Sequence, residues 1–173
     1  MKKLIYFAYM LVGLWMMTSC EKDEIGATAT ESMAGEWYVT AEAVDESGNL
    51  VFEDVFGLGH FLLNTYNTAA NVPTEMWVND NGNFWEFSLK VNVDINAMTF
   101  QSSGAVPNQS YEDCDVTLEG GKILPVAATT PHGTPADSIV FYVSFSDDSF
   151  PADYGYAKYK VSGYRYTGLT SDD

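Results

Sequence analysis

The sequence is poor in the residues that most often carry catalysis. Among 173 residues it has two histidines, His60 and His132, and a single arginine, Arg165. The two histidines are too far apart in the chain to form a metal-ligand cluster by spacing, and no Gly-x-Ser-x-Gly motif marks a serine nucleophile. We therefore predict no metal and no cofactor. No catalytic motif is present, so the sequence favours a protein that is not an enzyme, and His60 and His132 are the candidates for acid–base catalysis if it is one.

Long apolar runs are also lacking, except for one at the start of the chain. Two lysines precede the apolar stretch 4–17, and Thr18, Ser19 and Cys20 follow it. A basic start, a short apolar run and small residues are typical of a secretory signal, and the run is short for a membrane span. Cys20 stands where bacterial lipoproteins are cleaved and lipidated. We expect residues 1–19 to be a lipoprotein signal peptide; an ordinary secretory signal or a membrane anchor is the alternative.

Basic residues are scarce throughout the rest of the sequence. Removing residues 1–19 takes away two of the eight basic side chains and none of the 24 acidic ones, so the formal charge falls from −16 to −18. Such a charge repels phosphate backbones and anionic headgroups, which excludes nucleic acid as a partner. Membrane attachment must then come from the lipid on Cys20. Cys114 is left without a disulfide partner, and flanking Asp113 and Asp115 predict an inert thiol.

The segment 20–33 follows the predicted lipidation site and consists of charged and small residues. Such a composition cannot pack, so we expect a flexible tether. Its first residues, Cys-Glu-Lys-Asp-Glu, resemble the export signal that follows the lipidated cysteine in surface lipoproteins of Bacteroides-type bacteria. This resemblance implies an outer-membrane lipoprotein exposed at the cell surface. A periplasmic location is the alternative.

No stretch longer than about ten residues has helical periodicity. Instead, apolar and polar residues alternate with a period of two in short segments separated by turn residues. In 85–93, 139–145 and 37–43 every second residue is apolar, as expected of strands with one face in a core. Further strands are expected at 58–66, 75–79, 97–101, 115–118, 121–125 and 155–166. The expected strands, joined without helices, predict one all-β domain, 34–173, built as an up-and-down antiparallel β-barrel of about eight strands or as a sandwich.

Two glycine-containing turns set the expected connections. Asn81-Gly82 is the dipeptide preferred in type I′ hairpins, and Gly120-Gly121 predicts a second tight hairpin. The longer links 45–57, 102–114 and 126–137 would then be loops at the barrel rims.

In the last predicted strand, Lys158 and Lys160 are expected to point outward. Arg165 lies an odd number of residues from both lysines, so its side chain is expected to point inward. A buried guanidinium needs a partner such as an aromatic face. Barrel closure brings the first strand beside the last, which places Trp37 near Arg165. Gly35 would let the chain turn closely under the barrel before Trp37 enters it.

Gly35, Trp37 and Arg165 resemble the Gly-x-Trp and arginine pair of the lipocalin, or calycin, superfamily. More closely, "AGEWYVTAEA", "FWEFSLKV" and "VSGYRYTG" are similar to a Bacteroides-type lipoprotein family labelled lipid-binding putative hydrolases. The resemblance covers about residues 34–169 and implies a lipocalin-like barrel in which these three residues close the structure.

Aromatic side chains are plentiful, with four tryptophans, eleven tyrosines and ten phenylalanines. An eight-stranded barrel either fills its interior or holds one small ligand, and small inward residues such as Ala41 and Gly163 leave room for one. We predict a small apolar or lipid-like ligand. The residues expected to contact it are Trp77, Trp85, Phe87, Phe141 and Tyr159.

Three alternatives remain open from the sequence. The family label implies an esterase-type hydrolase using His60 or His132. The outward tyrosines 38, 142, 156, 164 and 166 would suit a platform for glycan or protein. Asp147, Asp148 and Asp153 could hold Ca²⁺, although a solvated acidic turn explains them better.

Overall fold

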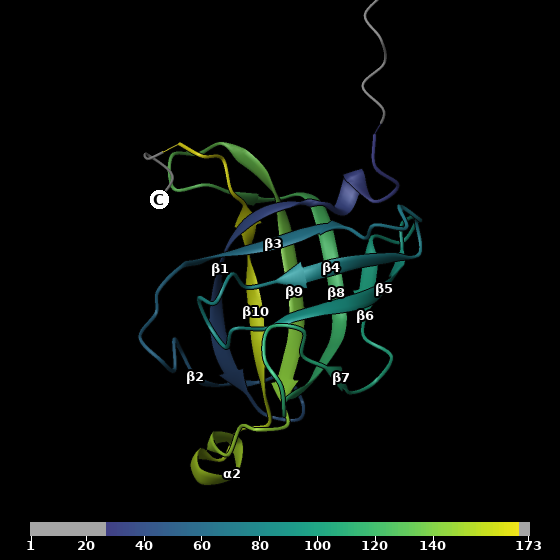
Figure 1. Cartoon of the computed structure of the whole chain (residues 1–173). Helices are drawn as coiled ribbons and strands as arrows, with labels where there is room; N and C mark the ends of the chain where they lie inside the picture. The colour runs from purple at the N-terminus through teal and green to yellow at the C-terminus, as the bar shows by residue number, and fades with distance from the viewer. Residues whose placement is uncertain (1–26, 170–173) are drawn as a thin grey trace, which may run out of the picture.

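The computed structural model describes residues 27–169, which form a barrel with a short helical segment at each end (Figure 1). The elements in chain order are η1 (Glu31–Met33), β1 (Gly35–Val44), β2 (Leu50–Phe52), β3 (Phe61–Asn67), β4 (Glu75–Asn79), β5 (Ser88–Asp94), β6 (Thr99–Gln101), β7 (Val106–Pro107), β8 (Asp115–Thr129), β9 (Pro135–Phe145), α2 (Phe150–Tyr154) and β10 (Lys158–Arg165). Among residues 27–169, neither helical segment has the length and apolar character needed to span a membrane.

Eight antiparallel strands close the barrel, which confirms the predicted fold class. The strands β1, β3, β4, β5, β6, β8, β9 and β10 pair in chain order, and β10 returns to pair with β1. The short strands β2 and β7 add to β1 and β8 without entering the ring. We call the end beside η1 the upper end and the end beside α2 the lower mouth (Figure 1).

The predicted signal peptide and Cys20 lie outside the described residues, as does the first half of the predicted tether. The rest of that tether is not all solvated. Residues 31–33 form η1, and Met33 is fully buried in the core. The packed part of the chain therefore begins before residue 34.

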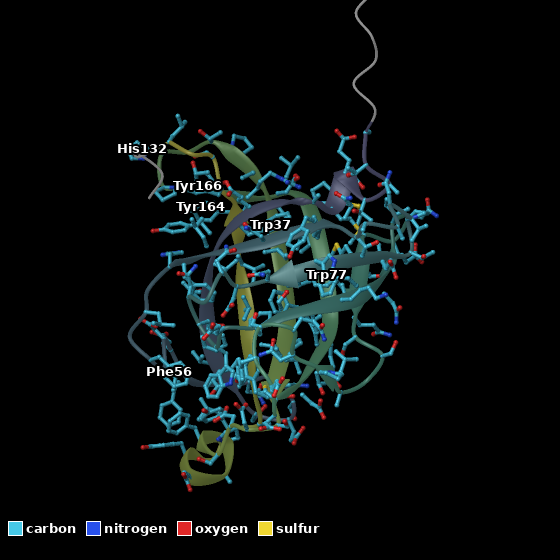
Figure 2. The ribbon with its side chains drawn as sticks, viewed as in Figure 1. Trp37, Phe56, Trp77, His132, Tyr164 and Tyr166 are labelled. Carbon is cyan, nitrogen blue, oxygen red and sulfur yellow. The ribbon has the colours of Figure 1, made fainter. Side chains whose placement is uncertain are left out.

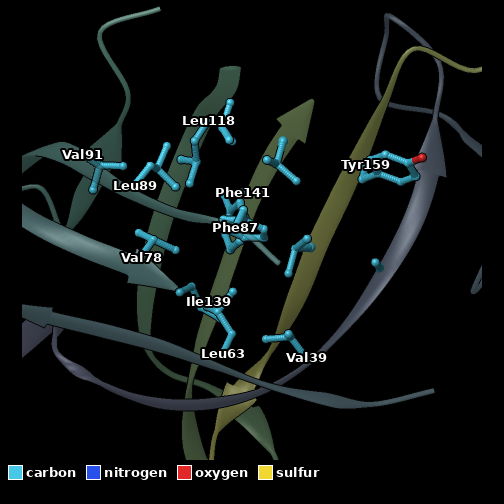
Figure 3. Close-up of a cluster of buried hydrophobic side chains, with 14 of the residues drawn as sticks. Val39, Leu63, Val78, Phe87, Leu89, Val91, Leu118, Ile139, Phe141 and Tyr159 are labelled. Carbon is cyan, nitrogen blue, oxygen red and sulfur yellow. The ribbon is translucent and has the colours of Figure 1, made fainter. Parts of the chain in front are cut away.

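Side chains fill the barrel interior (Figure 3). Alternation along β1, β5 and β9 directs one face of each strand inward, and the resulting core includes the fully buried Trp37, Leu89 and Phe141. The small residue Gly163 does not leave the open space expected from the sequence. A Cβ atom there would collide with the backbone carbonyl of Tyr38, so the missing side chain allows β1 and β10 to approach closely.

The predicted hairpin at Gly120-Gly121 is wrong. Residues 115–129 form one continuous strand, β8, which stays paired with β9 on both sides of the two glycines. The register shifts between Glu119 and Lys122, as in a β-bulge, and a Cβ atom on Gly121 would collide with the carbonyl of Phe100. The glycines therefore bend one strand and let β6 approach it, instead of reversing the chain.

The pairing of β4 with β5 is confirmed, but their connection is longer than a two-residue turn. Asn79 pairs with Ser88, and residues 80–87 between them form a loop. The buried carboxylate of Asp80 accepts backbone N–H groups of residues 82, 84, 85 and 87 at 2.8–3.0 Å. Trp85, which was predicted to begin the strand 85–93, therefore belongs to this loop and lies at the lower mouth.

The predicted rim loops are shorter than expected because strands continue into them. The link 45–57 contains β2, and the link 102–114 contains β7. The link 126–137 reduces to a short turn, since β8 runs to residue 129 and β9 begins at residue 135.

Candidate binding site at the lower mouth

Phe56 covers the lower mouth of the barrel. It belongs to the loop between β2 and β3, and its ring centroid lies 5.7–5.8 Å from those of Phe84, Trp85, Phe150 and Tyr159. These four rings come from three separate parts of the chain: the 80–87 loop, α2 and β10. The contacts give an aromatic layer between the buried core and the solvent.

A hollow of about 430 Å³ lies on the outer side of this layer. Five of its lining residues are aromatic, two are acidic and one is Val55: Phe52, Glu53, Asp54, Val55, Phe56, Phe150, Tyr154 and Tyr156. We call it the mouth hollow. Its volume falls within the range of roughly 300–1,000 Å³ typical of small-molecule sites.

Four of the lining aromatics are exposed to an unusual degree for side chains of this size. Phe52, Phe56 and Phe150 are 40%, 36% and 39% exposed, and Tyr154 is 60% exposed. Figure 2 shows Phe56 at the lower end of the barrel beside α2, far from His132 at the upper end. Several exposed aromatics gathered in one concave place are typical of a binding surface.

Two acidic residues after β9 fix the aromatic side chains of the mouth. Asp147 accepts hydrogen bonds from the Tyr111 hydroxyl (2.7 Å) and the Trp85 indole N–H (3.2 Å). Asp148 accepts the Tyr159 hydroxyl at 2.6 Å, so the neighbouring Tyr156 hydroxyl, also 2.6 Å away, donates to Tyr159. The acidic turn thus has a structural role.

The pKa values around the mouth follow from this arrangement. Burial, and then hydrogen bonding to Asp148 and Tyr156, raise the pKa of Tyr159 well above its ordinary value. Burial also raises the pKa of Tyr111 and Tyr156. For Asp147, burial alone would raise the pKa, but hydrogen bonds from Tyr111 and other donors outweigh it and leave the pKa lowered. The tyrosines are therefore hydrogen-bond donors, and Asp147 is a carboxylate near neutral pH.

The loop that carries Phe56 is held by its own carboxylate. Asp54 adopts a positive φ of 40° and accepts the backbone N–H groups of Leu58 (2.7 Å) and Gly59 (3.0 Å). This fixes a tight bend directly around Phe56. It also holds a negative charge at the wall of the mouth hollow.

The residues predicted to contact a ligand fall into three separate environments. Phe87, Phe141 and Tyr159 are fully buried in the core. Trp85 is half-buried at the lower mouth and stacks on Phe145 with centroids 4.9 Å apart. Trp77 lies on the outer face of β4 and lines another hollow, of about 360 Å³, with Lys90, Val106 and Gln109 among other residues. Of the five, Trp85 and Tyr159 are brought together at the mouth, and the ligand contacts remain predictions.

Gly35, Trp37 and Arg165 meet at the upper end of the barrel. Arg165 pairs with Trp37 in the β1–β10 register, and its Cζ atom lies 4.4 Å from the indole centroid. Its Nη1 donates to the carbonyl of Ala34 (2.7 Å), and its Nε donates to Asp137 (3.1 Å). A Cβ atom on Gly35 would occupy the space of Nη1. Glycine is therefore needed to admit the guanidinium, and this reason differs from the close turn expected there.

The two histidines lie apart from the mouth hollow. His60 stacks on Tyr38, with centroids 4.8 Å apart, on the outer face of the barrel. His132 is exposed in the turn between β8 and β9. Asp137 accepts Arg165 Nε with one oxygen and the backbone N–H of Val126 with the other. Both oxygens of this carboxylate thus already serve other donors.

The expected tyrosine platform is divided between distant places. Tyr38, Tyr164 and Tyr166 form one cluster, with centroids 5.9 Å from Tyr38, but Tyr164 is only 9% exposed. Tyr142 lies under Lys158 instead. The expectation of an exposed Tyr156 is wrong, because it precedes β10 and turns into the lower mouth, where it is 6% exposed.

The remaining candidate groups are metal ligands and the thiol of Cys114. No cluster of three or more His, Cys, Asp or Glu suited to a metal ion occurs within residues 27–169. Cys114 is 4% exposed, and burial is the main cause of its raised pKa. This agrees with the inert thiol that we expected, although burial, not the flanking aspartates, is the main reason.

The sequence interpretation missed the mouth hollow because all of its residues except Tyr156 lie in segments that were not assigned to strands. Phe52 and Phe56 belong to the link 45–57, and Phe150 and Tyr154 follow the acidic turn. A usable signal was present. Four large aromatics in segments otherwise rich in glycine, proline and acids are unusual for solvated loops.

One comparison with known proteins identifies a family for this chain. No curated protein matches the sequence. A family described as "Lipid-binding putative hydrolase" matches residues 22–170, which include all eight barrel strands and every residue of the mouth hollow. The chain therefore belongs to the lipid-binding putative hydrolase family.

Proposed function

We propose that this protein binds a single-chain apolar or lipid-like molecule in the mouth hollow, with the chain of the ligand lying against Phe52, Phe56 and Phe150. The observation that carries the proposal is the concave group of exposed aromatic rings at the lower mouth of a barrel whose interior is filled with side chains. Removing such surface from water is favourable by about 25 cal/mol per Å². The family match supports a lipid-like ligand.

The proposal can be tested with dodecyl maltoside, a neutral amphiphile, used below the concentration at which it forms micelles. Binding should change the fluorescence of Trp85, whose ring lies 5.8 Å from that of Phe56. Phe150→Ala should weaken binding about tenfold or more, because it removes one wall of the hollow. Tyr66→Ala is the matched control, since Tyr66 and Phe150 are both 39% exposed and Tyr66 lies on β3. Equal effects of the two variants would contradict the site.

We also propose that the protein is a lipoprotein attached through Cys20, because its N-terminal residues have the pattern described above. A labelled fatty acid should be incorporated into the wild-type protein and not into Cys20→Ser. Unchanged labelling of the variant would contradict lipidation.

The segment after Cys20 supports a surface location in this proposal. Replacing Lys22, Asp23 and Glu24 by alanine should keep the protein inside the cell, protected from protease added to intact cells. The wild-type protein should be removed by the same treatment. Equal removal of both would contradict an export signal in this segment, and the periplasm would be the location if neither were removed.

A further inference from the structure

The two segments that bound the mouth hollow carry acidic charge without lysine or arginine. Residues 50–60 contain Glu53 and Asp54, and residues 147–156 contain Asp147, Asp148 and Asp153. Glu53 and Asp54 line the hollow directly. The one basic-type residue in these segments is His60, whose ring is stacked on Tyr38. The electrostatic potential of the hollow is therefore negative near neutral pH.

None of the five described lysine and arginine residues lines the hollow, and four of them form ion pairs elsewhere. Lys160 pairs with Glu42 at 2.8 Å, Lys90 with Glu75 at 2.9 Å, and Arg165 with Asp137 at the upper end. Lys158 is closest to the mouth along the chain, but it pairs with Glu119 at 3.2 Å and lies over the ring of Tyr142. Each of these pairs is formed on an outer strand face or at the far end of the barrel.

Aromatic rings and carboxylates together favour a particular ligand chemistry. The faces of aromatic rings attract cations, and quaternary ammonium groups are recognised by groups of such rings. The hollow combines five aromatic residues with two carboxylates, and Asp54 is held in place by two backbone N–H groups. A fatty acid carboxylate would meet repulsion at the same position.

We infer that the mouth hollow selects amphiphiles with a cationic headgroup of the alkylammonium type, with the ammonium beside Glu53 and Asp54 and the chain against Phe56 and Phe150. This inference rests on the proposed function, since it names the headgroup of a ligand at the same site. It also predicts that salt weakens selectivity, because the attraction is between partly exposed charges.

The test compares three amphiphiles that share a dodecyl chain: dodecyltrimethylammonium, dodecyl maltoside and dodecanoate, each below its micelle-forming concentration. Dodecyltrimethylammonium should bind the full-length protein about tenfold more tightly than dodecyl maltoside, and dodecanoate should bind most weakly. The ratio between the cationic and neutral ligands should fall in 0.5 M sodium chloride.

Two charge variants separate a local effect from the overall charge. Glu53→Gln should reduce the ratio of cationic to neutral affinity about threefold or more, whereas Glu31→Gln, at the upper end, should leave it unchanged. Equal effects would attribute the preference to net charge and overturn the inference. Equal affinities of the cationic and neutral ligands, with both still lost in Phe150→Ala, would overturn the inference and keep the proposed function. If no amphiphile bound at the mouth, both would fail.

Discussion

Removing Arg165 or Trp37 should reveal a pair whose contributions to stability are coupled. The guanidinium of Arg165 lies over the fully buried indole of Trp37 and donates to the carbonyl of Ala34. The hydrogen bond from the charged guanidinium to Ala34 contributes about 1.5–3 kcal/mol to the free energy of unfolding. The cation–π contact with Trp37 contributes about 0.5–2 kcal/mol. The ion pair with Asp137 adds at most about 1 kcal/mol, since both side chains are roughly a third exposed. We expect Arg165→Ala to cost about 2–4 kcal/mol, allowing for incomplete additivity.

Trp37→Ala should cost about 3–5 kcal/mol, as is usual for a large buried aromatic. Both single variants lose the same ring–guanidinium contact, so the double variant loses it only once. Its cost should be smaller than the sum of the single costs by about 0.5–2 kcal/mol. Urea unfolding followed by circular dichroism measures all four proteins without depending on the fluorescence of Trp37.

Trp37→Phe provides the control for this cycle. It keeps a ring beneath Arg165 but removes the indole N–H, which donates to Thr65 at 2.8 Å. Coupling to Arg165→Ala should largely persist in this variant. If the cost of the Arg165→Ala/Trp37→Ala double variant equalled the sum of the two single costs within about 0.5 kcal/mol, the stacked pair would be refuted as a source of stability.

Three further outcomes follow from the packing and from the contrast between binding and catalysis. Gly163→Ala should lower the free energy of unfolding by about 1–3 kcal/mol, because its Cβ atom meets the backbone of Tyr38, whereas Ser162→Ala should have little effect in the same urea assay. The stability that Asp147 contributes should be present above its ordinary pKa of 3.8 and lost as the pH falls through its lowered pKa, so unfolding of the wild type and Asp147→Asn should converge in acid; a constant difference would contradict this. His60→Ala and His132→Ala should leave amphiphile affinity within about tenfold, or about 1.4 kcal/mol, and an esterase activity that vanished with either change would favour the hydrolase.

The strand pattern was predictable because it depends on local alternation of apolar and polar residues, whereas closure into a barrel instead of a sandwich was implied by the lipocalin resemblance. The inward positions of Leu89, Val91 and Phe141 follow directly from a period of two, and a closed meander has to bring its first strand beside its last. The glycine pair at 120–121 was misread because a bulge and a hairpin require the same backbone freedom. Which of them forms depends on whether the flanking segments keep one common partner, here β9.

The binding mouth was much less predictable. Phe56 is placed by an irregular loop whose shape depends on Asp54, and its ring contacts come from three distant segments. Trp85 was assigned to a strand because its parity matched that of Phe87, but Glu86 between them has a φ of 52°, which ends the alternation there. Periodicity cannot report such tertiary contacts.

The placement of η1 and α2 at opposite ends of the barrel has a consequence for the direction of ligand entry. The chain enters the barrel from the end that carries η1, and the aromatic mouth opens at the other end, beside α2. If the protein is attached to a membrane through Cys20, as we propose, the tether would join the barrel at the end opposite the mouth. The mouth would then lie at the end of the barrel away from the tether, open to ligand from solution or from a facing surface.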